Sequence, residues 1–216
     1  MTDLQKPLKI CNFYTPKPLA QAMVQALGDR PEDLWLEPCF GEGVFLERLS
    51  KLRVSRERIY AVDIDEPSKS LDSLGQTFRG QDFLKWSMET QLRFDKIIGN
   101  PPYIGLSKLP QSLQCSALRL VDPVGHPIPL GSNCWYAFLC ASLDLLRPRG
   151  SLSFVLPAAW DYADYAASLR NSVGRLFDRF EVHRCLRPLF NDAQDGCVVI
   201  VGRDFGAKKN LELRFE

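Results

Sequence analysis

The 216-residue sequence lacks several features that would assign it to common classes of protein. No apolar run approaches the roughly 20 residues of a membrane-spanning helix. The first residues, Met1 to Pro7, lack the apolar core of a secretory signal peptide. The net charge is only +1, so the basic excess typical of a free-standing nucleic-acid-binding domain is missing too. We therefore expect a cytoplasmic protein with no membrane contact.

Metal-ligating patterns and repeats are also absent from the sequence. The seven cysteines form no Cys-x-x-Cys pair and have no nearby histidine cluster, which favours reduced, mostly buried thiols over zinc ligands. The two histidines, His126 and His183, match no catalytic pattern, and we expect no metal site. With 45% hydrophobic and 25% charged residues, a chain of this length suits one globular α/β domain.

Basic residues nevertheless gather in the last third of the chain. Two interpretations remain open for them: a local basic face that contacts phosphate groups, or the solvated surface of ordinary helices. The residues concerned are Arg147, Arg149, Arg170, Arg175, Arg179, Arg184, Arg187, Lys208 and Lys209.

The hydrophobic pattern alternates between strand-like and helix-like segments. We expect strands at 34–36, 58–63, 77–79, 94–98, 150–156, 180–185 and 197–201, and helices at 16–27, from 44 onward, at 67–74, at 134–146 (amphipathic) and at 162–176. The prolines and glycines between Leu106 and Ser132 indicate an irregular loop or a mobile lid. The alternation predicts an α/β fold with a Rossmann-like, doubly wound, mostly parallel sheet and helices on both faces.

Unusual residues follow the predicted strands, where open parallel sheets bind ligands. The turn 37–43, Glu-Pro-Cys-Phe-Gly-Glu-Gly, offers two glycines that let the backbone approach a ligand, although a tight turn needs glycine as well. Asp63 follows about twenty residues later, where a carboxylate commonly binds ribose hydroxyls. At the expected third strand end, Asp82 could accept from an amine and Phe83 could cover a purine, with helix capping as the alternative.

The segment Asn100-Pro101-Pro102-Tyr103 follows the strand at 94–98 and carries the most specific chemistry. The Asn100 side chain and the Pro101 backbone each offer a carbonyl acceptor, and the two prolines restrict their geometry. Two acceptors on one planar NH₂ group favour its change to a tetrahedral, methyl-accepting nitrogen. Tyr103 offers a flat face on which the acceptor could stack. The alternative is a structural Pro-Pro turn.

Taken in order, these segments resemble the motifs of the adenine-specific DNA methyltransferases of restriction-modification type, in their gamma group. The resemblance covers the chain from Tyr14 to about Val201 and implies the class I methyltransferase fold with S-adenosyl-L-methionine as cofactor. By this resemblance the cofactor-binding residues are Tyr14, Thr15, Pro16, Glu37, Pro38, Cys39, Gly41, Gly43, Phe45, Asp63, Ile64, Asp82, Phe83 and Asn100, and the catalytic residues are Asn100, Pro101, Pro102, Tyr103 and Phe190.

The resemblance implies transfer of a methyl group to the 6-amino group of adenine in double-stranded DNA. The target base would be flipped out of the duplex and stacked between Tyr103 and Phe190, for which a core position is the alternative. Residues 1–216 would form the catalytic domain of a nucleoid-associated enzyme, with target recognition beyond 216 or on a partner subunit. Cys39-Phe40 departs from the small or acidic residue usual in the family.

Other functions fit the same residues. The Asn-Pro-Pro-Tyr chemistry suits any planar amine, so adenine in RNA or a protein glutamine amide are alternative substrates. A third possibility is a cofactor-binding, non-catalytic subunit of a DNA-modifying complex.

Overall fold

The chain folds around one seven-stranded sheet with strand order β3-β2-β1-β4-β5-β7-β6. A computed structural model describes residues 15–28, 30–66, 69–184 and 196–206. The strands are β1 (Trp35–Glu37), β2 (Ile59–Val62), β3 (Gln76–Phe78), β4 (Phe94–Gly99), β5 (Leu146–Pro157), β6 (Phe177–Arg184) and β7 (Cys197–Phe205). Strands β1 to β5 pair in parallel, and β7 runs antiparallel to both β5 and β6. This arrangement confirms the predicted mostly parallel, doubly wound α/β fold.

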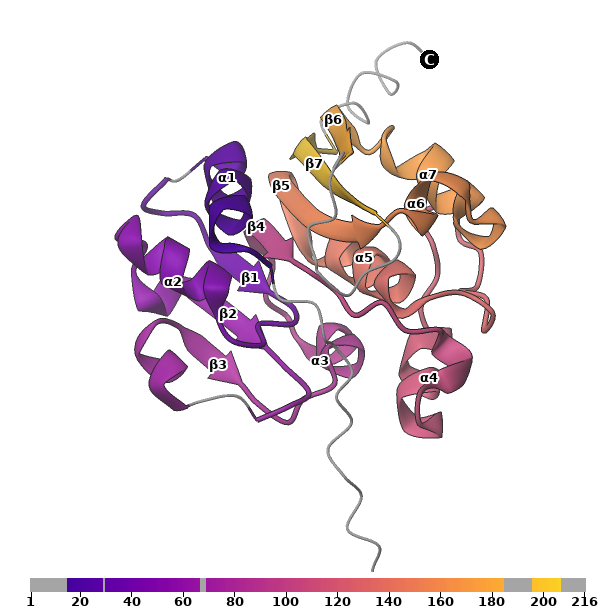
Figure 1. Cartoon of the computed structure of the whole chain (residues 1–216), viewed down its shortest axis with the longest axis horizontal. Helices are drawn as coiled ribbons and strands as arrows, with labels where there is room; N and C mark the ends of the chain where they lie inside the picture. Colours follow the sequence, from indigo (N-terminus) through magenta and orange to yellow (C-terminus); the bar gives the residue numbers. More distant parts are fainter. Residues whose placement is uncertain (1–14, 29, 67–68, 185–195, 207–216) are drawn as a thin grey trace, which may run out of the picture.

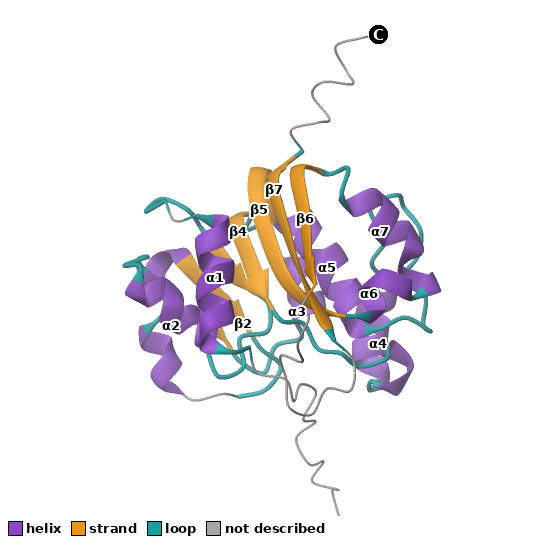
Figure 2. Ribbon diagram, turned by 45° about the horizontal axis from the view of Figure 1, so that its top comes forward, coloured by secondary structure: helices purple, strands orange, loops and turns teal. Residues whose placement is uncertain are grey.

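Helices cover both faces of the sheet (Figures 1 and 2). The helices are α1 (Lys17–Leu27), α2 (Val44–Lys51), α3 (Phe83–Glu89), α4 (Gln111–Leu118), α5 (Cys134–Leu145), α6 (Ala159–Tyr162) and α7 (Ala167–Val173). Helices α1 and α2 lie on one face, and α3, α5, α6 and α7 lie on the other (Figure 2). No helix in the described part of the chain is long and apolar enough to cross a membrane.

Two apolar clusters fill the space between the sheet and its helices. Neighbouring strand residues point to opposite faces, so Trp35 packs with α1 and α2 while Leu36 packs with α5. In the same way Val155 belongs to the cluster of Trp35, and Phe154 belongs to the cluster of Leu36. Strands buried on both faces need continuous apolar runs, and this is why 197–201 could be predicted from the sequence. The strand at 94–98 is apolar only at Phe94 and at 97–98, because Asp95 and Lys96 interrupt it.

Helix α5 differs from the amphipathic helix predicted at 134–146. Eleven of its 12 residues are buried. One side packs against the sheet, and the other is covered by α3 through Phe83, which contacts Phe138, and by Trp160 of α6, which contacts Trp135. Only Asp144 is exposed among these 12 residues. A helix covered on all sides keeps no polar stripe, so the prediction of amphipathicity was wrong.

The segment 106–132 is more regular than the predicted loop or lid. It contains a 3₁₀ turn at Leu106–Lys108 and helix α4, and its two ends are joined by hydrogen bonds. The Leu106 N–H donates to the Ser132 carbonyl at 2.9 Å, and the Cys134 N–H donates to the Ile104 carbonyl at 2.8 Å. Pro110, taken from the sequence as a helix breaker, directly precedes the first residue of α4, a position that proline tolerates.

Three smaller predictions also need correction. The helix expected at 162–176 is divided into α6, a 3₁₀ turn at Asp164–Ala166 and α7. The helix expected at 67–74 is a 3₁₀ turn at Lys69–Ser73 in its described part. Asp82 does not end a strand: β3 stops at Phe78, and the chain turns at Gly80, whose φ is +62°, before α3 begins.

The described cysteines mostly follow the expectation of buried thiols. Cys134, Cys140 and Cys197 are buried and Cys39 is half-buried, whereas Cys115 on α4 is exposed.

Candidate active site

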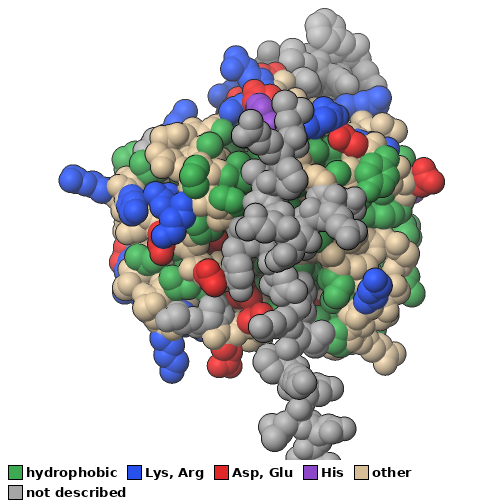
Figure 3. All heavy atoms as spheres, viewed as in Figure 1, with side chains coloured by type: hydrophobic (Ala, Val, Ile, Leu, Met, Phe, Trp, Pro, Cys, Tyr) green, Lys and Arg blue, Asp and Glu red, His purple; other side chains and the backbone are tan. Residues whose placement is uncertain are grey.

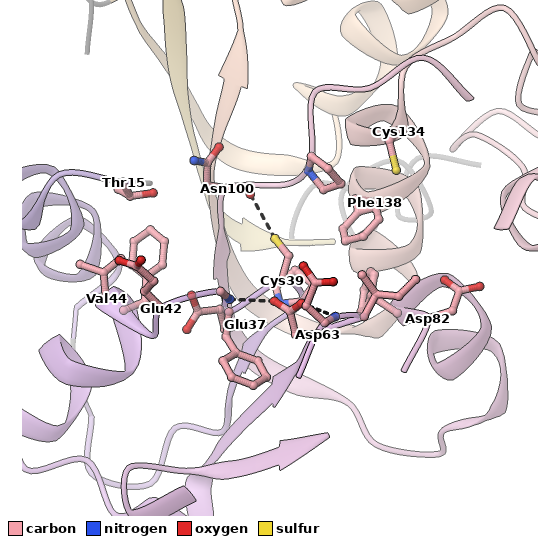
Figure 4. A pocket seen from close by; sticks show the side chains of 18 of the residues that line it. Thr15, Glu37, Cys39, Glu42, Val44, Asp63, Asp82, Asn100, Cys134 and Phe138 are labelled. Atoms are coloured by element: carbon pink, nitrogen blue, oxygen red, sulfur yellow. Dashed lines mark hydrogen bonds between the residues drawn. The ribbon is translucent and has the colours of Figure 1, made fainter. Parts of the chain in front are cut away.

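A cavity of about 290 Å³ opens at the carboxyl ends of β1, β2 and β4. Figure 4 shows Thr15 and Val44 on one side of it, Cys134 and Phe138 on the other, and Glu37, Cys39 and Asp63 between them. The lining residues are Thr15, Lys17, Glu37, Pro38, Cys39, Phe40, Gly41, Glu42, Val44, Phe45, Glu47, Asp63, Ile64, Asp65, Asp82, Phe83, Leu84, Asn100, Pro102, Leu109, Leu113, Cys134 and Phe138. The cavity therefore occupies the ligand-binding edge of an open parallel sheet.

The turn after β1 depends on Gly43, the residue before α2. Gly43 has a φ of +76° in the left-handed region, and its N–H donates to the Phe40 carbonyl at 2.7 Å. A Cβ atom there would lie 2.7 Å from Leu71 Cδ2. Both the backbone conformation and the close packing therefore favour glycine. This turn aims the backbone N–H groups at the start of α2 toward the edge of the sheet.

Asp63 follows β2, and two backbone donors hold its carboxylate in place. Oδ2 accepts from the Gly41 N–H at 2.7 Å, and Oδ1 accepts from the Asp65 N–H at 2.9 Å (Figure 4). Burial raises the pKa of Asp63, and the N–H groups of Gly41 and Asp65 oppose that rise because they stabilise the charged form. The result is an oriented acceptor that joins the turn after β1 to the end of β2.

Glu37, the last residue of β1, is a buried acid with 2% of its surface exposed. Its pKa is raised well above the ordinary value, first by burial and second by the nearby charge of Asp63. The Leu46 N–H in the first turn of α2 acts in the opposite direction. No described residue forms a hydrogen bond with Oε2 of Glu37. A buried carboxyl oxygen in this state is suited to a ligand donor or cation.

Asn100 follows β4 directly and lines the cavity with 7% of its surface exposed. Its backbone carbonyl accepts a hydrogen bond from the Cys39 thiol at 3.2 Å, across 61 positions of the chain (Figure 4). Pro102 also lines the cavity, Pro101 is buried and does not belong to the lining, and Tyr103 is half-buried between the two apolar clusters. The loop after β4 is therefore fixed to the turn after β1.

The far wall of the cavity is apolar and comes largely from α3 and α5. The Phe83 and Phe138 rings lie 5.0 Å apart between centroids. Asp82 caps α3, because its Oδ1 accepts from the Leu84 N–H at 3.0 Å. Capping was the structural alternative for this residue, and the cap coexists with its place in the cavity lining.

The structure brings most of the predicted site residues together. Those that line the cavity are Thr15, Glu37, Pro38, Cys39, Gly41, Phe45, Asp63, Ile64, Asp82, Phe83, Asn100 and Pro102. Pro16, Gly43, Pro101 and Tyr103 are described and do not belong to the lining. Tyr14 and Phe190 lie outside the described residues.

Several lining residues were not predicted. Leu109 and Leu113 come from the segment taken as an irregular loop, and Cys134 and Phe138 come from the first turns of α5. Local pattern gives no signal for these contributions because they arise when α4 and α5 pack against α3. Phe40, Glu42 and Leu84 stand beside predicted residues, and their positions within the motifs could have identified them.

Intramolecular contacts account for several of the basic residues in the last third of the chain. Arg184 pairs with Asp161 through two nitrogens, at 2.8 and 2.7 Å, and Arg147 pairs with Asp95 at 2.7 Å. Arg170 donates to the Trp160 carbonyl at 2.7 Å. On the face seen in Figure 3, Lys and Arg side chains gather mainly at the top edge, with acidic side chains among them, and others are scattered over the face. For Arg147, Arg170 and Arg184, these contacts favour the interpretation as an ordinary solvated surface over a basic DNA-binding face. Arg187, Lys208 and Lys209 lie outside the described residues.

Comparison with known proteins relates the chain to bacterial methyltransferases. It is 33% identical over 165 residues to the Type II methyltransferase M.TthHB8I of Thermus thermophilus, covering 74% of this chain and 38% of that protein. It is 30% identical over 181 residues to the Type II methyltransferase M.VspI of a Vibrio species, covering 77% of this chain and 43% of that protein. The chain thus spans about two fifths of the length of these relatives.

Solved structures share the fold at lower sequence identity. The modification subunit of a putative type I restriction enzyme from Vibrio vulnificus superposes with a TM-score of 0.67 at 17% identity, covering 92% of this chain and 46% of that one. The type I restriction-modification methyltransferase subunit from Streptococcus thermophilus gives a TM-score of 0.68 at 20% identity, covering 89% of this chain and 45% of that one.

The sequence profile of one family matches residues 48–187, which is more than half of the chain. The match includes β2 to β5 and the Asn100 loop, so it extends over the centre of the fold and not over a single motif. The chain belongs to the Eco57I restriction-modification methylase family.

Proposed function

We propose that the chain transfers a methyl group from S-adenosyl-L-methionine to the 6-amino group of adenine in double-stranded DNA. The observation that carries this proposal is the position of Asn100, at the end of β4 on the wall of the cavity and fixed there through Cys39. The relatives named as Type II methyltransferases support a methyl transfer.

The Asn100 loop would act on the amine that accepts the methyl group. The Asn100 side-chain carbonyl and the Pro101 backbone carbonyl would each accept one proton of the NH₂ group, which moves the nitrogen lone pair out of conjugation with the ring. Proline contributes no N–H at position 101, and this keeps a competing donor away from the amine. The acceptors need only position the amine, because the cofactor supplies the reactive methyl group.

The residues of the cavity fit S-adenosyl-L-methionine. The oriented carboxylate of Asp63 would accept from the ribose hydroxyls, and Phe83 and Phe138 would pack against the adenine ring. Asp82 would accept from the exocyclic amine of that ring through Oδ2, since its cap occupies Oδ1. The buried carboxyl group of Glu37, with its unbonded Oε2, would face the positively charged methionine end beside Thr15 and Phe45.

The substrate would reach this cavity by base flipping, since an amine inside a duplex cannot contact Asn100. Tyr103 would support the base from the side of the Asn100 loop, and Phe190, which lies outside the described residues, would close the opposite face. The net charge is only +1, and Arg147, Arg170 and Arg184 are engaged in contacts within the chain. Target recognition would therefore come from residues beyond 216 or from a partner subunit, as part of a nucleoid-associated enzyme.

The test measures both the methylated product and the binding of the cofactor. The full chain is incubated with tritium-labelled S-adenosyl-L-methionine and adenine-unmethylated duplex DNA, and digested nucleosides are identified by mass spectrometry. Label is expected in N6-methyladenine. Asn100→Ala should lower the rate by about 100-fold or more while the Kd of the cofactor changes little. Asp63→Ala should weaken cofactor binding. Asn171→Ala, at an exposed position on α7, is the matched control.

Each other result would contradict the proposal in a defined way. Label in N4-methylcytosine, RNA or protein glutamine would assign a different planar amine to the same loop. Cofactor binding without label in any polymer would support a non-catalytic subunit. If Asn100→Ala abolishes cofactor binding and Asp63→Ala spares it, the roles of the two residues are wrong.

A further inference from the structure

Glu37 differs from the other acids around the cavity because it is deeply buried and incompletely bonded. Only 2% of its surface is exposed, although it lines the cavity. Among the described residues, none bonds to Oε2. Asp63, in contrast, has a backbone donor on each carboxylate oxygen. The two acids line the same cavity, but hydrogen bonds hold both carboxylate oxygens of Asp63 and leave Oε2 of Glu37 without a donor.

Most of the charged side chains that line the cavity with Glu37 are acidic, so they do not stabilise its carboxylate form. The other ionisable side chains of the lining are Lys17, Glu42, Glu47, Asp63, Asp65 and Asp82, together with the thiols of Cys39 and Cys134. Lys17 is the one base in this set, and its Nζ lies 3.6 Å from Oε2 of Glu47, with which it pairs. The Leu46 N–H is the backbone group that favours ionisation of Glu37, and Asp63 opposes ionisation. The acidic lining is therefore suited to a cationic ligand.

We propose that Glu37 is a proton-linked receptor for a cationic centre of the ligand: it holds a proton in the empty cavity and loses it when the cation enters. This inference rests on the proposed function, because S-adenosyl-L-methionine carries two cationic centres, an ammonium and a sulfonium. The balance of the step is simple. The O–H bond of the Glu37 carboxylic acid breaks, the proton passes to solvent, and the carboxylate forms an ion pair with the ligand.

The physical basis is the cost of a buried charge. A carboxylate without a partner is strongly unfavourable in a buried site, so the group stays neutral instead. Burial and Asp63 both raise the pKa of Glu37, in agreement with this geometry. A cation within contact distance reverses the preference because the charged form then has a partner. Ligand affinity must consequently depend on pH through Glu37.

Equilibrium titration of the full chain across a pH series tests the inference without measuring activity. The association constant of S-adenosyl-L-methionine should rise by up to about tenfold per pH unit below the pKa of Glu37 in the empty cavity, and level off above it. Calorimetry in buffers of different ionisation enthalpy should show release of up to about one proton per ligand in the rising range. Glu37→Gln should remove both the slope and the proton release.

Two further ligands separate the two cationic centres. S-adenosylhomocysteine keeps the ammonium and lacks the sulfonium, and 5′-methylthioadenosine lacks both. If the slope persists with S-adenosylhomocysteine and disappears with 5′-methylthioadenosine, Glu37 pairs with the ammonium. If only S-adenosyl-L-methionine shows the slope, the partner is the sulfonium, and the cavity then favours the cofactor over its demethylated product.

A matched control limits the effect to the buried acid. Asp178→Asn changes an exposed acid on β6, outside the cavity lining, and should leave the slope intact. The inference is overturned if Glu37→Gln keeps the wild-type slope, or if 5′-methylthioadenosine releases as many protons as S-adenosyl-L-methionine. Failure of every adenosyl ligand to bind the wild-type chain would instead overturn the proposed function, so the two failures are distinguishable.

Discussion

The ends of β1, β2 and β4 contrast with helix α5 and its neighbours on the same sheet. The strand ends carry buried polar residues, Glu37, Asp63 and Asn100, each less than one tenth exposed. Helix α5 has 11 of 12 residues buried, nearly all of them apolar or aromatic. One region therefore holds groups that are costly to remove from water, and the other supplies the apolar burial that stabilises the domain.

The contrast teaches where activity and stability are located in this fold. Glu37 and Asp63 lie close enough for the charge of one to raise the pKa of the other, an arrangement that pure packing would avoid. A protein can tolerate such a site when the rest of its core offsets the cost. Substitutions in α5 should therefore affect mainly the free energy of unfolding, whereas those at the strand ends should affect mainly ligand binding and turnover.

The largest effect on stability is expected in α5. Leu139→Ala removes a fully buried side chain and should lower the free energy of unfolding by about 2–5 kcal/mol, because the packed helix leaves a cavity that cannot collapse. Urea denaturation measures the change, and turnover of the molecules that remain folded should be nearly normal. Asp144→Asn, at the exposed position of α5, is the control and should have little effect. Equal losses in both variants would contradict the assignment of stability to the buried face.

Glu37→Gln should produce the opposite result at neutral pH. The folded-state pKa of Glu37 is raised above the ordinary value of 4.5, so this group contributes stability that is complete below that value. The contribution falls as pH rises toward the folded pKa, with a slope of up to about 1.4 kcal/mol per pH unit. The variant should be more stable than the wild type at pH 7, and the difference should vanish near the ordinary pKa. A difference that is constant with pH would refute buried ionisation as its cause.

Gly43→Ala tests the turn that joins the two kinds of region. Alanine in a left-handed conformation costs about 1–2 kcal/mol, and its Cβ would lie 2.7 Å from Leu71 Cδ2, so Leu71 must also move. Stability and affinity for the cofactor should both fall. Gly80→Ala is a matched control, because Gly80 has a φ of +62° and its added Cβ meets only an ordinary contact at 3.8 Å. The extra loss at position 43 measures the displacement of Leu71.

Features encoded by the local sequence could be predicted, whereas features that depend on tertiary packing could not. The strand Cys197–Phe205 and the turn after β1 are encoded locally, by the apolar run 197–201 and by glycines at fixed spacing, and both were predicted. The acids at 37 and 63 were singled out because they follow such strands. Their buried state was not predictable, because it depends on how β1, β2 and α2 pack together.

The missed features arise from contacts between distant segments. Nothing in 106–132 indicates that its ends pair with each other or that Leu109 and Leu113 reach the cavity. Helix α5 looked amphipathic because the sequence does not show that α3 and α6 cover its outer side. Asp82 was assigned to a strand end because the sequence pattern does not reveal the turn at Gly80, which separates Asp82 from the end of β3. The local sequence pattern thus identified the polar residues of the site, whereas tertiary packing determined which apolar residues line the cavity.

The smallest expected effect concerns Cys39, which lines the cavity beside Asn100. Its thiol donates to the Asn100 carbonyl at 3.2 Å, and one neutral hydrogen bond contributes about 0.5–1.5 kcal/mol. If the proposed reaction is correct, Cys39→Ala should lower kcat by about 2- to 13-fold while the KM of the cofactor changes little, because the bond positions the amine-accepting loop. Cys39→Ser should restore most of the rate, since a hydroxyl can donate to the same carbonyl. Cys115→Ala, an exposed thiol on α4, is the control. A serine variant as slow as the alanine variant would show that thiol size, and not its hydrogen bond to Asn100, matters at this position.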